Sequence, residues 1–120
     1  MLESLQPAAL FNKVTSVQNS QAIGMRINNY AVFQASLEGV SGSVSATIQL
    51  YGSNDPVVDT NPLYAASNLL GTFTLTNTAN GLGFSVAQQV ISVQQPYRKF
   101  WAGISSISGI GTAVSLWAAV

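Results

Sequence analysis

The last 21 residues of the chain, FWAGISSISGIGTAVSLWAAV (100–120), carry no charged side chain and decide the fold class. A membrane-spanning helix needs about 20 predominantly apolar residues, but here serines, a threonine and glycines interrupt the apolar run. Apolar residues recur at every second position in two short segments, and SGIG, which is typical of a turn, separates them. The two apolar sets are Phe100, Ala102 and Ile104, and then Val114, Leu116, Ala118 and Val120. The stretch is therefore predicted to form a β-hairpin.

The register of this hairpin places both tryptophans of the chain on one face. If the apolar sets share a side, the turn has an odd number of residues, most often three. Trp101 and Trp117 then stand away from Phe100 and Leu116. Exposed aromatic side chains indicate a protein contact or a sugar-stacking surface. The alternative is that a second sheet covers this face, which would make both tryptophans part of the core.

Upstream, the clearest strand is SVSATIQLY (43–51), in which apolar and polar residues alternate without a break and Tyr51 falls on the polar side. YAVFQASL (30–37) alternates in the same way. The connecting EGVSG (38–42) is short and contains glycine. The two strands are therefore predicted to form a second hairpin.

Two further segments complete the strand pattern. LLGTFTLTN (69–77) alternates throughout, whereas FSVAQQVISV (84–93) changes phase once, which predicts a β-bulge or a break near residues 88–89. No stretch favours a helix, and turn signals recur about every ten residues. The sequence thus predicts an all-β protein, an antiparallel β-sandwich or jelly roll of seven or eight short strands.

Residues 1–20 differ from the rest and are predicted to be an N-terminal arm, with residues 21–120 forming the β-sandwich domain. The arm is predicted to be irregular at its start and to end in a possible strand. A frayed terminus would also fit its position, but its apolar side chains favour contact with a neighbouring molecule. Those side chains are Leu2, Leu5, Leu10 and Phe11.

The composition narrows the function. Four acidic and four basic residues give no net charge, and 7% charged residues compares with about 25% in an average domain. Such a neutral surface tends to associate, and we expect an oligomer or larger assembly. It also argues against broad electrostatic binding to nucleic acid, and Arg98 and Lys99 alone are too few to change that. We expect no membrane segment, and no secretion signal at the start of the chain.

The chain is poor in catalytic groups. It contains no cysteine and no histidine, which removes thiolate chemistry and the commonest acid–base residue. Asp55 and Asp59 are the only close acidic pair, and their spacing does not fit a calcium-binding EF-hand loop. A turn, with Asn54 and Asp55 bonding the backbone, explains them more simply. We expect no enzyme activity, no catalytic or metal-binding residue and no cofactor.

Three segments carry a family resemblance: ATIQLYGSNDP (46–56), LGTFTLTN (70–77) and PYRKFWAGISSISGIGTAVSLW (96–117). Across roughly residues 25–120, the chain resembles small β-sandwich virion proteins of tailed bacteriophages. In that family, one strand ends in a Gly-Ser-Asn-Asp turn, and a later strand runs from an aromatic–Arg segment into a glycine-rich hairpin. A tryptophan that often follows the turn there is replaced here by residues 56–58, PVV, so its role does not carry over.

The resemblance implies a non-enzymatic virion structural protein. The leading expectation is a capsid decoration or cement protein on the capsid surface, with the major capsid protein as partner and with a homo-oligomeric state. One alternative is a structural or adaptor protein of the tail or fibre, and another is a carbohydrate-binding module. The residues expected to contact a partner are Leu2, Leu5, Leu10, Phe11, Tyr51, Trp101 and Trp117.

Overall fold

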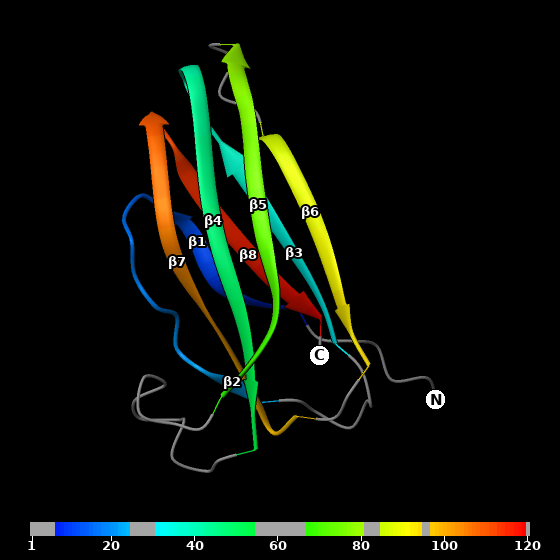
Figure 1. Cartoon of the computed structure of the whole chain (residues 1–120). Helices are drawn as coiled ribbons and strands as arrows, with labels where there is room; N and C mark the ends of the chain where they lie inside the picture. The colour runs from blue at the N-terminus through cyan, green and yellow to red at the C-terminus, as the bar shows by residue number, and fades with distance from the viewer. Residues whose placement is uncertain (1–6, 25–30, 55–66, 81–84, 95–96, 120) are drawn as a thin grey trace.

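The computed structural model describes residues 7–24, 31–54, 67–80, 85–94 and 97–119. In these residues the chain is all-β, with two antiparallel four-stranded sheets packed face to face (Figure 1), which confirms the predicted β-sandwich. The strands are β1 (Pro7–Val14), β2 (Ile23–Gly24), β3 (Ala31–Glu38), β4 (Ser41–Ser53), β5 (Asn68–Asn80), β6 (Ser85–Val93), β7 (Lys99–Ile110) and β8 (Ala113–Ala119).

The strand order identifies the sandwich as a jelly roll. Sheet A has the order β1-β8-β3-β6, and sheet B has the order β2-β7-β4-β5. The first strand pairs with the last, the second with the seventh, the third with the sixth and the fourth with the fifth. This nested antiparallel pairing is what a single long hairpin produces when it folds over on itself. Additional pairing of β8 with β3 and of β7 with β4 completes the two sheets.

Both predicted hairpins are wrong, although their strands exist. β3 and β4 belong to different sheets, and so do β7 and β8. The connections at Gly39–Val40 and Gly111–Thr112 therefore cross from one sheet to the other, and the Val40 N–H donates to the Ile110 carbonyl at 3.0 Å. The reason is that alternation reports which face of a strand is buried. Two strands that face each other across a core have the same alternation as two strands paired side by side.

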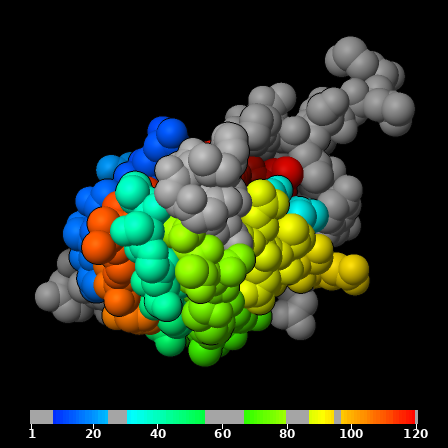
Figure 2. All heavy atoms as spheres, turned by 90° about the horizontal axis from the view of Figure 1, so that it is seen from above, coloured from blue at the N-terminus to red at the C-terminus, as the bar shows by residue number. Residues whose placement is uncertain are grey.

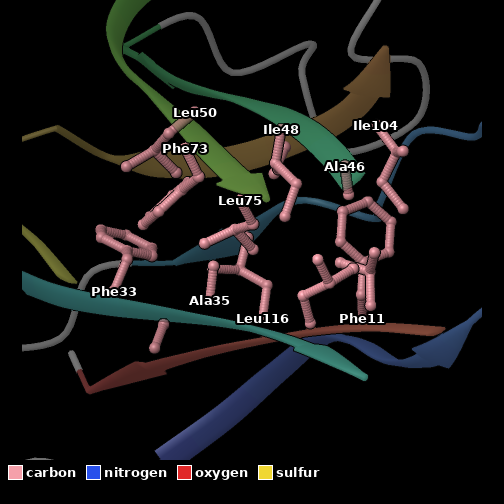
Figure 3. Close-up of a cluster of buried hydrophobic side chains, with 14 of the residues drawn as sticks. Phe11, Phe33, Ala35, Ala46, Ile48, Leu50, Phe73, Leu75, Ile104 and Leu116 are labelled. Carbon is pink, nitrogen blue, oxygen red and sulfur yellow. The ribbon is translucent and has the colours of Figure 1, made fainter. Parts of the chain in front are cut away.

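The core fills the space between the sheets. Phe33 and Leu116 from sheet A point toward Leu50 and Phe73 from sheet B, and all four side chains are fully buried (Figure 3). The Phe33 ring meets the Phe100 ring edge to face, with centroids 5.1 Å apart. The apolar side chains of the alternating strands thus form one continuous cluster, as a two-layer sandwich requires.

Side-chain bonds of Gln89 close one side of the sandwich, between β5 and β6. In Figure 2, β5 (green) lies beside β6 (yellow), although they belong to different sheets. Gln89 of β6 bridges them, because its Oε1 accepts the Thr74 N–H at 3.0 Å and its Nε2 approaches the Thr72 carbonyl at 3.5 Å. The register of β6 slips between Ser85 and Ala87, slightly before the predicted bulge at residues 88–89. Gln89 is the cross-strand partner of the buried Ala35, so it lies on the inward side of its strand.

Candidate functional site

The structure separates the predicted contact aromatics onto opposite surfaces of the sandwich. Trp101 on β7 is the cross-strand neighbour of Tyr51 on β4, on the outer side of sheet B. Trp117 on β8 lies on the outer side of sheet A, beside Gln34 of β3. Each tryptophan points away from the core, as predicted. The prediction that a hairpin places both tryptophans on one face is wrong, because β7 and β8 are in different sheets.

Trp101 is fixed in place by its surroundings. Its ring stacks on Tyr51 with centroids 4.3 Å apart and an angle of 15° between planes. Its indole N–H donates to Ser67 Oγ at 3.0 Å, and only 5% of the residue is exposed. Tyr51 remains half-buried, and its hydroxyl donates to Gln49 Oε1 at 2.9 Å. Trp101 therefore acts mainly as a support that orients Tyr51.

A hollow of about 140 Å³ opens beside this aromatic pair, and we call it the sheet B hollow. None of the described side chains that line it carries a charge. Two carboxamides, a hydroxyl group and the two aromatic rings supply its chemistry. Its lining residues are Asn19, Gln49, Tyr51, Trp101, Gly103, Ile104 and Ser105.

The segment before β2 builds one wall of the hollow. Residues 18–20 run along β7, where the Ser20 N–H donates to the Ala102 carbonyl and the Ile104 N–H donates to the Gln18 carbonyl. These bonds place Asn19 opposite Gly103. A Cβ at position 103 would lie 2.6 Å from Asn19 Oδ1, so only glycine lets this side chain rest there. Glycine inside a strand often marks such a close approach, so Gly103 is the sequence signal that could have indicated this wall of the hollow.

The outer side of sheet A forms a second candidate surface, which we call the Trp117 face. One row across the four strands runs from Ala9 through Trp117 and Gln34 to Val90. Trp117 is 40% exposed and Val90 is 55% exposed. The next row contains Ala119, Val32 and Ser92. Neither row carries a charged side chain, so the centre of this face is neutral and partly apolar.

The described part of the predicted arm belongs to the sandwich. Residues 7–14 form β1, an edge strand of sheet A that pairs with β8. Phe11 is 2% exposed and packs in the core, and Leu10 packs partly buried against it. Leu2 and Leu5 lie outside the described residues, as do Asp55 and Asp59. Asn54 Oδ1 accepts the backbone N–H of Arg98 at 2.9 Å, which ties the end of β4 to the start of β7.

Comparison with known proteins adds no relative. No family model, no curated protein and no solved structure matches this chain. Within the described ranges, no cluster of three or more His, Cys, Asp or Glu side chains is placed to hold a metal ion. The same residues contain no helix long and apolar enough to cross a membrane. Over the described parts of the chain, the fold is an eight-stranded jelly roll with two outer features, the Trp117 face and the sheet B hollow, whose described side chains carry no charge.

Proposed function

We propose that this chain is a non-enzymatic virion structural protein of the capsid decoration or cement type. It docks on the assembled shell through the Trp117 face. The observation that carries the proposal is an exposed tryptophan at the centre of a neutral sheet surface. Jelly rolls recur in viral capsid proteins, and also in lectins and cupins, so the fold supports the proposal by analogy only.

The chemistry of the Trp117 face suits a protein contact. Tryptophan is enriched among the residues that dominate binding energy. The row that contains Trp117 and the next row contain no charged side chain. Docking through these rows therefore carries no penalty for the desolvation of a charge. The contact therefore depends on apolar burial and neutral hydrogen bonds.

The size of the face indicates how such docking would work. Four strands spaced about 4.8 Å apart and seven residues of about 3.3 Å each give roughly 400 Å² of sheet surface. A standard interface buries about 800 Å² on each partner. A single contact is therefore weak, and stable attachment requires many copies on a repeating lattice or an oligomer of the chain. Since the protein binds only the assembled shell, it stabilises that shell by linkage.

The first test compares particles with and without the protein. Particles that lack it should release their contents at a lower temperature and under milder osmotic shock. Its copy number should be comparable with that of the major shell subunit. Equal resistance of the two kinds of particle would contradict cementing, and only a few copies per particle would favour a place in the tail or fibre.

The second test isolates the docking face. Trp101→Phe leaves Trp117 as the only tryptophan, and its emission should shift to shorter wavelength when the protein attaches to particles. Trp117→Ala should weaken attachment. Ile110→Ala is the matched control, since Ile110 is 67% exposed but lies on β7 of sheet B. Equal attachment of Trp117→Ala and the wild type would overturn the assignment of this face.

A further inference from the structure

We infer that the sheet B hollow is a binding site for one ring of a neutral saccharide. The inference does not depend on the proposed function, because the hollow and the Trp117 face lie on opposite sides of the sandwich. Both surfaces can therefore be occupied at the same time.

The polar groups of the hollow suit sugar hydroxyl groups. Gln49 Oε1 is already bonded to the Tyr51 hydroxyl, which leaves Gln49 Nε2 as a donor at the rim. Ser105 Oγ donates to the Thr47 carbonyl at 3.3 Å, and its lone pairs remain free to accept. The Asn19 carboxamide makes no hydrogen bond to any other described residue, so it offers both a donor and an acceptor. A hydroxyl group can donate to one of these atoms while it accepts from another.

The aromatic part of the hollow suits the apolar side of a sugar ring. Tyr51 is half-buried, and Trp101 holds its ring by stacking. An aromatic ring with a polar tip combines an apolar contact surface with a hydrogen-bonding group. The hydrogen bonds of Trp101 to Ser67 and of Tyr51 to Gln49 fix both side chains before a ligand arrives. Such preorganisation reduces the entropy lost on binding.

Charge and size define the ligand class. Because none of the described lining residues is charged, none of them compensates an acidic or basic ligand. Its volume of about 140 Å³ is below the range of about 300–1,000 Å³ that holds drug-sized ligands. One neutral sugar ring fits this description, and a dissociation constant of about 1 mM or weaker is expected for so shallow a site. Repeated copies would raise the effective affinity for a surface that carries many glycans.

The experiment is a titration followed by ¹H–¹⁵N NMR. The probes are the methyl glycosides of glucose, galactose, mannose and N-acetylglucosamine, with glucuronic acid as the charged comparison. At least one neutral probe should shift the side-chain amide signals of Asn19 and Gln49 and leave that of Gln34, on the opposite sheet, in place. Asn19→Ala and Gln49→Ala should each weaken binding about five- to tenfold. Gln34→Ala is the matched control and should bind like the wild type.

Three results would overturn the inference: no neutral probe shifts these signals, glucuronic acid binds as tightly as the best neutral probe, or neither alanine variant weakens binding. Preserved dispersion of the backbone signals establishes that each variant folds. Gly103→Ala gives an independent check, because its Cβ would displace the Asn19 side chain and should weaken binding without removing any polar group. Trp117→Ala should leave sugar binding intact, so failure here is distinguishable from failure of particle docking.

Discussion

Replacement of Gly109 by alanine tests the crossing between the sheets, the feature that distinguishes this jelly roll from a set of hairpins. Gly109 lies near the end of β7, just before the chain passes to β8, and has a φ of 113°. A Cβ there would lie 2.6 Å from Val44 Cγ1 and 2.7 Å from the Ser43 carbonyl oxygen. The valine methyl group can shift by rotation, but the carbonyl belongs to the backbone of β4. Alanine is therefore disfavoured at position 109 for two reasons: the backbone has a positive φ, and the added Cβ would collide with β4.

Gly42 supplies the matched control. Its φ is 73°, and a Cβ there would meet no atom within 4 Å. Alanine at Gly42 should lower the free energy of unfolding by about 1 kcal/mol. The positive φ destabilises the folded state by about 1–2 kcal/mol, and the lower conformational entropy of the unfolded chain offsets about 0.4–1 kcal/mol of that loss. Alanine at Gly109 adds overpacking of about 1–3 kcal/mol. Its total cost is therefore about 2–4 kcal/mol, a large share of the 5–15 kcal/mol or so that stabilises a typical domain.

The assay is thermal unfolding followed by circular dichroism. At about 4 °C per kcal/mol for a domain of this size, Gly42→Ala should lower the Tm by about 4 °C and Gly109→Ala by about 8–16 °C. Urea unfolding should give the same order of stability with unchanged m-values. If Gly109→Ala is no less stable than Gly42→Ala, the backbone of β4 does not pack against Gly109 as described, and the account of the crossing is wrong.

Three other measurements examine the core, the tryptophans and the docking chemistry. Phe33→Ala should cost about 3–5 kcal/mol of unfolding free energy, because it empties a fully buried site in contact with Phe100, and urea unfolding measures the loss. In acrylamide quenching, the variant that keeps only Trp101 should be protected and the variant that keeps only Trp117 should be quenched; equal quenching would contradict their 5% and 40% exposure. Attachment to particles should change little between low and high salt, since the Trp117 rows carry no charge, and a steep loss at high salt would indicate a different contact surface.

The sequence was sufficient for six of the eight strands and for the direction of several of their faces, whereas β2 was not predicted and β1 lies where an N-terminal arm was expected. Alternation in residues 43–51 placed Tyr51 outside and the apolar residues inside, and alternation in residues 100–120 did the same for Trp101 and Trp117. It could not identify strand neighbours, because the same pattern results from pairing within a sheet and from packing between sheets. Those pairings depend on contacts between residues far apart in the chain, such as β1 with β8.

The candidate sites were predictable to different degrees. Trp117 was predicted to point away from the core, and the structure places it on an outer face with 40% of its surface exposed. Two of the seven described lining residues of the sheet B hollow, Tyr51 and Trp101, were among the predicted contact residues. Asn19 was not, because its place beside Gly103 depends on backbone bonds between residues 18–20 and β7. No local pattern in the sequence around Asn19 reports those bonds.

The two outer surfaces of the sandwich differ in a way that supports one orientation of the proposed docking. On sheet B, four threonines follow one another along the outer side of β5, and β4 places hydroxyl and carboxamide side chains beside them. The threonines are Thr72, Thr74, Thr76 and Thr78, opposite Gln49, Thr47, Ser45 and Ser43. Such a surface stays hydrated without charge, whereas the centre of sheet A presents Trp117 and Val90. On sheet B the exposed large apolar residues, Leu69 and Ile110, lie at the ends of β5 and β7 and not at the centre of the face. The proposed docking therefore places the centre of sheet A, with Trp117 and Val90, against the shell, where their burial removes apolar surface from water. The hydroxyl-rich side, with its hollow, would then face the solvent, where a glycan can reach it.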